Sequence, residues 1–151
     1  MRRQDRALSE AEARELLARC DYGVLASVDE DGWPYAVPVN HVLVGDVLFI
    51  HCAPEGHKLR NLAHDARVSY CVVGTAKVLP EQLSTRYESA IAFGRVSAVQ
   101  GTAEKRAALE LLVRRLAPER LGDAGPYIDQ HIVRTVVLRI GIERLTGKAR
   151  R

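Results

Sequence analysis

The turn Gly45-Asp46 constrains this chain more than any other feature, because it joins two β-rich runs with only two residues. Glycine at the first position of such a turn is typical of a tight β-hairpin. The runs at residues 33–44 and 47–52 must therefore pair antiparallel, with Val44 opposite Val47. A parallel pair would need a crossover of about a dozen residues or more. The hairpin therefore directs the chain toward an antiparallel sheet.

Extending this register predicts which side chains share a face of the sheet. Asn40 falls opposite His51, and His41 falls opposite Ile50. The two histidines then point to opposite faces, which disfavours a metal site built from both. Both faces are largely apolar, as expected for a barrel wall with its core inside and another subunit outside. One face carries Pro38, Asn40, Val42, Phe49 and His51, and the other carries Val39, Leu43, Leu48, Ile50 and Cys52.

Hydrophobic periodicity and turn signals predict about six strands and three helices. Ser9 and Glu12 form a capping box, Thr102 is expected to cap the third helix, and Pro118 ends it. Gly94 marks a bulge or bend. Strands are expected at residues 22–28, 33–44, 47–52, 67–74, 87–99 and 131–145, helices at 9–20, 56–64 and 102–116, and loops at 75–83 and 121–127. Short antiparallel connections favour a mainly β, α+β fold, an antiparallel barrel with peripheral helices.

Composition bounds the class of protein. Apolar residues make up 47% and charged residues 27% of the 151 residues, so a single domain over residues 1–151 is expected. No apolar run could cross a bilayer and the N-terminus lacks the centre of a signal peptide, which predicts a cytoplasmic protein without membrane contact. Three cysteines without a C-x-x-C pair indicate neither a disulfide framework nor a zinc ribbon. Part of the net charge of +3 lies in a basic tail at about 147–151, interpreted as a solvated segment.

The segment from residue 47 to residue 70 is the candidate for anion binding. A β-like run leads through a loop ending at Gly56 into a predicted helix, whose first turn carries His57 and Lys58. A helix start offers free N–H groups and the positive end of the dipole, and Lys58 adds a full charge there. A phosphate-bearing cofactor is the functional hypothesis. The alternative is that Gly56 only makes a turn and Lys58 is solvated.

Several catalytic signatures are absent. The chain has no G-x-G-x-x-G after a strand, no G-x-x-x-x-G-K-[ST], no G-x-S-x-G and no H-E-x-x-H. Rossmann, P-loop, α/β-hydrolase and zincin chemistry therefore receive no support. A zinc site from His51, Cys52, His57 and His64 matches no familiar spacing, so no metal site is predicted.

The order of motifs nevertheless resembles a known family. The motifs are Gly32-Trp33-Pro34-Tyr35-x-x-Pro38-Val39 after an acidic turn, Gly56-His57-Lys58-Leu59-Arg60-Asn61-Leu62 entering a helix, and Ala66-Arg67-Val68-Ser69 in the next strand. In this order they resemble the FMN-binding split β-barrel of the pyridoxamine 5′-phosphate oxidase-like superfamily, across residues 9–148. The stretch at 87–95 and the ending at 142–148 are most similar to the nitroimidazole-resistance (Nim)-like branch.

The resemblance implies FMN as the cofactor and assigns residues to it. Backbone groups of the first strand would line the isoalloxazine edge, a basic pair would hold the phosphate, and a polar side chain on a later strand would meet the ring. The implied cofactor-binding residues are Val37, Pro38, Val39, Asn40, His51, Cys52, His57, Lys58, Asn61 and Ser89. His51 is the implied catalytic residue, as a proton donor or anion contact. Its alternative role is that of a hydrogen-bonded histidine in the barrel wall.

The chain also departs from the vitamin B6 oxidases of this superfamily. Val37 and Val42 stand where those enzymes carry basic residues, and their Arg-rich C-terminal substrate site is not found. These differences favour a Nim-like reductase or another flavoprotein acting on a small molecule. His57 in place of a permanently charged arginine would weaken phosphate binding as pH rises.

Three classes of function follow. The first is an FMN-dependent, nitroreductase-like oxidoreductase. The second is a non-catalytic carrier of flavin, deazaflavin or haem, with His51, His57 or His131 as a haem ligand. The third, a nucleic-acid-binding barrel, is disfavoured because Trp33 and a few tyrosines are the only stacking groups and the charge is low. The resemblance also implies a homodimer with the flavin at its two-fold interface.

Overall fold

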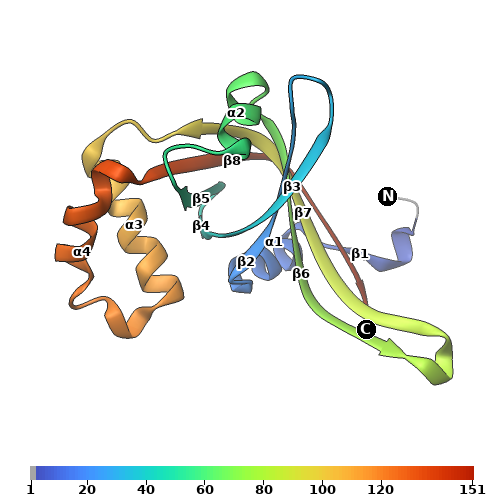
Figure 1. The fold of residues 1–151 in the computed structure, drawn as a ribbon. Helices are drawn as coiled ribbons and strands as arrows, with labels where there is room; N and C mark the ends of the chain where they lie inside the picture. The colour runs from blue at the N-terminus through green and yellow to red at the C-terminus, as the bar shows by residue number, and fades with distance from the viewer. Residues whose placement is uncertain (1–2) are drawn as a thin grey trace.

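The computed structural model describes residues 3–151, and a curled antiparallel sheet dominates it (Figure 1). The strand order is β3-β2-β6-β7-β8-β5-β4, and β1 pairs with β8. The strands are β1 (Ala7–Leu8), β2 (Tyr22–Val28), β3 (Pro34–Asn40), β4 (Val42–Val44), β5 (Val47–Cys52), β6 (Arg67–Leu79), β7 (Ser84–Ala98) and β8 (Val136–Arg150). Strand β3, at one end of the order, also contacts β5 near the other end. The sheet therefore curls into a split barrel, which confirms the predicted fold class.

The α-helices surround this sheet. They are α1 (Glu10–Arg19), α2 (His57–His64), α3 (Thr102–Leu116) and α4 (Ala124–His131), and short 3-10 turns lie at Gln4–Arg6, Pro80–Gln82, Pro118–Arg120 and Ile132–Arg134. The predicted capping box is present at the start of α1. Helices α3 and α4 lie together at one side, between β7 and β8 in the chain (Figure 1). No helix within residues 3–151 is long and apolar enough to span a bilayer.

Two hydrophobic clusters stabilise the two sides of β5. Leu48 and Ile50 belong to the main core, which lies inside the curled sheet and under α1. Phe49 packs instead against a second cluster that includes Val137 of β8 and Leu112 of α3. Alternate residues of one strand thus enter different cores, which is why both faces of this hairpin are apolar.

The predicted hairpin register is confirmed only as far as Val42, which pairs with Phe49. Asn40 pairs with Tyr22 of β2, so the prediction that it lies opposite His51 is wrong. His41 separates β3 from β4 and is buried, with its Nε2 2.7 Å from the Leu17 carbonyl oxygen. The single strand predicted at 33–44 is therefore two strands, and the second half alone forms the hairpin.

The other corrections concern segments with weak periodicity. Residues 75–79 continue β6, and residues 124–127 begin α4, where loops were predicted. His131 ends α4 instead of beginning the last strand, and most of the expected solvated tail belongs to β8, which extends to Arg150. Gly101, not Thr102, is the N-cap of α3. The described residues thus contain eight strands and four α-helices, more than the six and three predicted.

Candidate functional site

The start of α2 has no side chain that caps its amides. Gly56 is its N-cap and has φ of 140°, a conformation that L side chains rarely adopt. The amides of Leu59 and Arg60 bond to the Gly56 carbonyl oxygen at 3.1 and 3.3 Å. The preceding amides, of His57 and Lys58, have no such partner within the helix, so they carry the partial positive charge of its start.

Lys58 adds a cation beside the end of β5. Its charge acts on the Cys52 thiol, where it opposes the rise in pKa that burial causes. Lys58 is half-buried, and none of the ion pairs among residues 3–151 includes it. A half-buried cation without a carboxylate next to free helix amides is the arrangement that binds a phosphate group.

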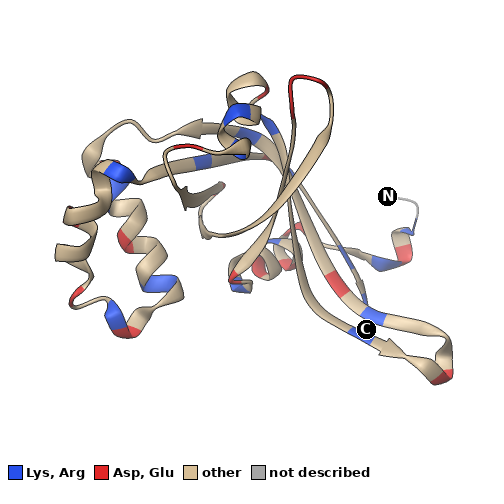
Figure 2. Ribbon diagram, viewed as in Figure 1, with Lys and Arg blue, Asp and Glu red and all other residues tan. Residues whose placement is uncertain are grey.

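His57 lies on another side of the same helix turn. Its ring is 4.3 Å from that of Tyr35, centroid to centroid, and its Nε2 is 4.0 Å from the Asp29 carboxylate. A cavity of about 370 Å³ here is lined by His57, Arg60 and the acidic turn at residues 29–31, which Figure 2 shows beside α2. These carboxylates would repel a phosphate. The structure therefore separates the predicted basic pair and leaves Lys58 as the cation for an anion.

Asn61 has a structural contact. It is 2% exposed, and its Nδ2 donates to the Ser27 hydroxyl at 3.1 Å, which ties α2 to β2. Leu59 and Leu62 of α2 also pack against the main core, whereas Ala63 is exposed. The buried face of α2 thus combines two leucines with the hydrogen-bonded Asn61.

Strand β3 offers an unpaired edge next to α2. It is a terminal strand of the sheet, so the backbone groups on its outer side have no strand partner, and Pro38 is tolerated there. The side chains of Val37 and Val39 pack on the core, and those of Pro38 and Asn40 are exposed. The Tyr70 hydroxyl donates to the Val39 carbonyl oxygen at 2.7 Å, which holds this edge in place.

His51 and Ser89 lie apart from Lys58. His51 alternates with Cys52 on β5 and lines a cavity under α3 and α4. Burial lowers the pKa of His51, which favours the neutral ring at neutral pH. Ser89 pairs with Val73 and with Lys148, on the outer face of the sheet. Ser89 is four residues along β7 from Phe93, which is about 13 Å at the usual strand rise. Phe93 pairs with Ser69 of β6, and Ser69 in turn pairs with β2.

The cavity under α3 and α4 was not predicted. It measures about 280 Å³ and is lined mainly by apolar side chains of both helices, with His51 and His131 as its imidazoles. The Nδ1 of His131 is 2.8 Å from the Tyr127 carbonyl oxygen, and the two rings stack at 4.1 Å. Because Nδ1 of His131 carries the hydrogen that this carbonyl accepts, Nε2 keeps a free lone pair. The sequence did not predict that His51 and His131 share a cavity, because it assigned His131 to a strand.

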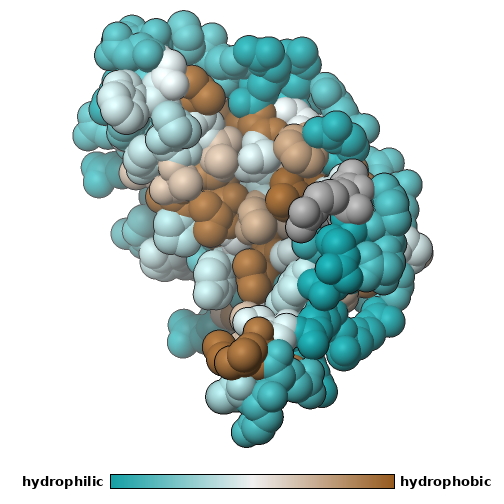
Figure 3. Space-filling view, turned by 90° about the vertical axis from the view of Figure 1, so that its right-hand side faces the viewer, coloured by the Kyte–Doolittle hydropathy of each residue, from teal (hydrophilic) through white to brown (hydrophobic). Residues whose placement is uncertain are grey.

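The outer face of the sheet is apolar and exposed. Val24 is 38% and Val73 57% exposed, and Cys71, which pairs with Val24, lies between them. Ile91, which pairs with Cys71, extends the face onto β7. Figure 3 shows a hydrophobic band across one side of the molecule, bordered by hydrophilic residues. Monomeric proteins rarely expose so continuous an apolar patch, and such patches are usually covered by a partner.

No group of three or more His, Cys, Asp or Glu side chains in residues 3–151 is arranged to hold a metal ion. A curled antiparallel sheet flanked by α-helices defines the fold class, an α+β split barrel. The basic start of α2 lies at the open edge of this sheet. The family model for pyridoxamine 5′-phosphate oxidase matches residues 9–149, and the chain belongs to this flavin-binding family.

Solved structures share this fold. A candidate 5-nitroimidazole antibiotic resistance protein from Bacteroides thetaiotaomicron is 26% identical, with a TM-score of 0.82 over 94% of this chain and 85% of that one. An FAD and heme binding protein from Mycobacterium smegmatis is 28% identical, with a TM-score of 0.81 over 93% and 71%. The flavocytochrome Anf3 from Azotobacter vinelandii, at 19% identity and a TM-score of 0.84 over 100% and 72%, shows the same fold. No curated protein sequence matches this chain.

Proposed function

We propose that this protein is an FMN-binding oxidoreductase that acts on a small molecule, with the FMN phosphate at the start of α2. The observation that carries the proposal is Lys58, a half-buried cation without a carboxylate partner among the described residues, beside the free amides of an uncapped helix. The family is flavin-binding, and a 26% identical structure is a candidate nitroimidazole resistance protein. Both support a reductase of the Nim-like type.

The residues around Lys58 would bind and orient the flavin. A bound flavin supplies the redox chemistry, and the protein supplies position, hydrogen bonds and exclusion of water. The free edge of β3, at Val37 to Asn40, offers backbone donors and acceptors for the ring. Cys52 lies beside Lys58 at the end of β5. His51 faces the other side of β5, and its neutral ring is proposed to form hydrogen bonds to the substrate.

We further propose that the active form is a homodimer that buries the outer face. Its apolar side chains, including Val73 and Ile91, are accessible on the single chain. Ser89 is separated from Lys58 within one chain, so a flavin contact by Ser89 would be made across the dimer interface. Each site would then draw residues from both protomers.

The test compares two charge-removing variants of the same helix. Lys58→Gln should weaken FMN binding about tenfold or more, because a charged hydrogen bond to phosphate contributes about 1.5–3 kcal/mol. Arg60→Gln, which faces the acidic cavity, is the matched control and should bind FMN normally. Riboflavin lacks the phosphate, so its affinity should not change in either variant. Equal FMN affinity for both variants would remove Lys58 from the phosphate site.

The cavity with His51 and His131 supports a second candidate function, haem binding. Apolar walls and an imidazole lone pair suit an axially ligated porphyrin, and the 28% identical Mycobacterium smegmatis protein binds heme as well as FAD. The absorption spectrum of the purified protein, before and after haemin is added, tests it. A Soret band that is lost in both His51→Ala and His131→Ala would support haem ligation; a spectrum without one would refute it.

A further inference from the structure

The far end of the β6–β7 hairpin, together with the end of β8, forms a ribbon that projects from the barrel (Figure 1). Tyr87 lies on this ribbon directly opposite Arg150, so their side chains share one face. Lys148 is two residues before Arg150 on the same face, with its Nζ 5.6 Å from the centre of the Tyr87 ring. Arg6, at the chain's start, also hydrogen-bonds the Tyr87 side chain. We call Arg6, Lys148 and Arg150 the Tyr87 cation group.

This group is poorly neutralised. Arg150 donates to the Gln82 side-chain oxygen at 3.2 Å, which is uncharged, and no ion pair within residues 3–151 includes Arg150 or Lys148. Among residues 3–151, the ion pair of Arg6 is with Asp5, at 3.9 Å, and Asp5 is held more closely by Arg3, at 2.6 Å. Cations brought together in this way repel one another, and a bound anion would relieve the repulsion.

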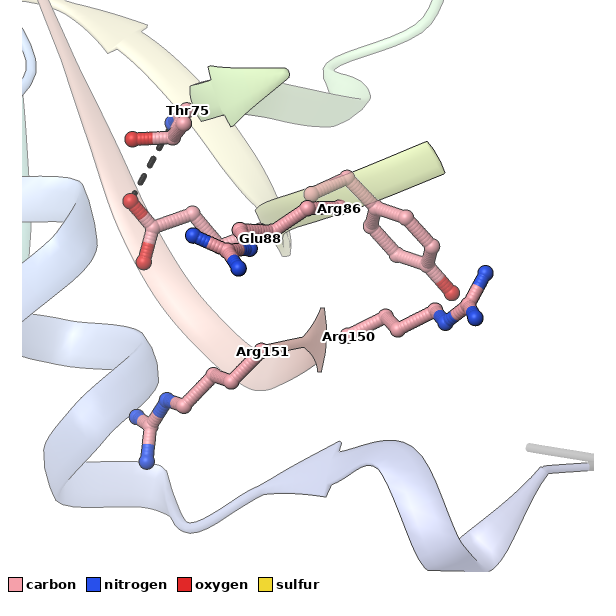
Figure 4. A pocket seen from close by; sticks show the side chains of 6 residues that line it. Thr75, Arg86, Glu88, Arg150 and Arg151 are labelled. Atoms are coloured by element: carbon pink, nitrogen blue, oxygen red, sulfur yellow. Dashed lines mark hydrogen bonds between the residues drawn. The ribbon is translucent and has the colours of Figure 1, made fainter. Parts of the chain in front are cut away.

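The nearby acidic side chains are already occupied. Glu88 accepts from the Thr75 amide at 3.1 Å and pairs with Arg19, and both partners lower its pKa. Arg151 leaves the ribbon to pair with Glu12 at 2.7 Å. Figure 4 shows the Thr75–Glu88 bond and shows Arg150 and Arg151 extending in opposite directions from the end of β8. Glu88 and Glu12 are therefore engaged by other cations and do not neutralise the Tyr87 cation group.

A cavity adjoins the group. It measures about 440 Å³ and is lined by Thr75, Arg86, Tyr87, Glu88, Arg150 and Arg151. The register of β6 and β7 shifts between Val73 and Ala76, which leaves Thr75 outside the strand ladder and opens the surface there. The cations around Tyr87 also lower the pKa of its phenol, which shows that the field at this point is positive. The volume exceeds what one phosphate needs and has room for part of a nucleotide.

We propose that the Tyr87 cation group binds a phosphate group of a nucleotide-type small molecule. Arg150 and Arg6 supply planar donor pairs that match phosphate oxygens, Lys148 adds charge, and the Tyr87 hydroxyl donates a hydrogen bond. The site is distinct from Lys58, because α2 and the ribbon lie at different ends of the molecule (Figure 1). Two sources have this chemistry: a nicotinamide nucleotide that donates electrons, and the second phosphate of FAD held by another copy of the chain.

Calorimetric titration with inorganic pyrophosphate tests the site. The double variant Arg6→Gln/Arg150→Gln should lose affinity about a hundredfold, at about tenfold for each arginine. Arg134→Gln removes an exposed arginine beyond α4 and is the matched control, which should bind like the parent. Bound pyrophosphate should also raise the pKa of the Tyr87 phenol, a signal that Tyr87→Phe abolishes. Unchanged affinity in the double variant would overturn the proposal.

Titrations with larger ligands distinguish the sources of the phosphate. Tighter binding of NADPH than NADH would identify the 2′-phosphate of a nicotinamide nucleotide. FAD binding that is weakened by Arg6→Gln/Arg150→Gln, while FMN binding is unchanged, would identify the second phosphate of FAD. A duplex oligonucleotide that binds more tightly than every small ligand would overturn the proposal in favour of a nucleic-acid surface. Because the pyrophosphate arm needs no flavin, its failure is distinguishable from failure of the proposed function.

Discussion

Replacing Tyr70 with phenylalanine tests the polar contact that fixes strand β3. Tyr70 is fully buried, and its hydroxyl lies 2.7 Å from the Val39 carbonyl oxygen and 2.9 Å from the Nδ1 of His41. The Nε2 of His41 is 2.7 Å from the Leu17 carbonyl oxygen and must donate to it. Burial lowers the pKa of His41, so the ring is neutral and Nδ1 is an acceptor. One phenolic hydrogen therefore serves two acceptors, a buried one on His41 and a part-buried one on Val39.

Tyr70→Phe removes that hydrogen and leaves both acceptors without their donor, while the ring still fills its place. A buried group left unsatisfied costs about 1–3 kcal/mol, so we expect the free energy of unfolding to fall by about 2–4 kcal/mol. Urea unfolding followed by circular dichroism measures it. Tyr22→Phe, at a side chain 62% exposed, is the control and should change stability little. A loss below about 0.5 kcal/mol for Tyr70→Phe would refute the reasoning.

His41 also makes this network sensitive to acid. Its pKa is lower in the folded protein than the ordinary 6.5, so the unfolded chain takes up the proton first as pH falls. The contribution of neutral His41 is complete above about pH 6.5 and declines below it, so unfolding of the parent protein should become easier from about pH 6.5 downward. The same urea titrations repeated between pH 5 and 8 test the sign.

Two further substitutions test packing and assembly. Gly94→Ala places a Cβ on the Gly141 carbonyl at the predicted β7 bulge, and rigid backbone overlap of this kind typically costs about 1–3 kcal/mol; thermal unfolding should show the loss, and Gly122→Ala, where a Cβ has open space, should not. Val73→Asp puts a charge on the outer face and should convert a dimer to a monomer in analytical ultracentrifugation, whereas Val133→Asp, at an 87% exposed site elsewhere, should not. A parent protein that is monomeric at all concentrations would contradict the dimer.

The parts of the fold that the sequence predicted well have a local physical cause. The Ser9 capping box, the Gly45-Asp46 turn and the Gly94 bulge each depend on a few neighbouring residues, and all three are confirmed. The family resemblance is confirmed as well. The errors arise where distant partners decide. Residues 75–79 have little alternation, yet they extend β6 because β7 lies alongside to pair with them.

The break at His41 could not be predicted for the same reason. The run at 33–44 contains strand-forming residues throughout, and nothing local shows that β3 leaves its hairpin to pair with β2. The interaction of His41 with Tyr70 and Leu17 stabilises that break, and those partners lie 29 and 24 residues away in sequence. A register extrapolated from a turn is therefore reliable only until a buried polar side chain competes with the ladder.

The candidate site shows why adjacency in sequence does not make a functional pair. His57 and Lys58 are neighbours, but successive residues on a helix point about 100° apart. Tyr35 and Asp29 hold His57 on the acidic side, which leaves Lys58 alone beside Cys52. A single lysine and two helix amides supply fewer donors than a phosphate dianion can accept, so a tightly bound flavin would need further donors. The free edge of β3 lies alongside the start of α2. A second protomer that covers the apolar outer face would supply the remaining donors. The small number of donors around Lys58 on one chain thus supports the proposed assembly.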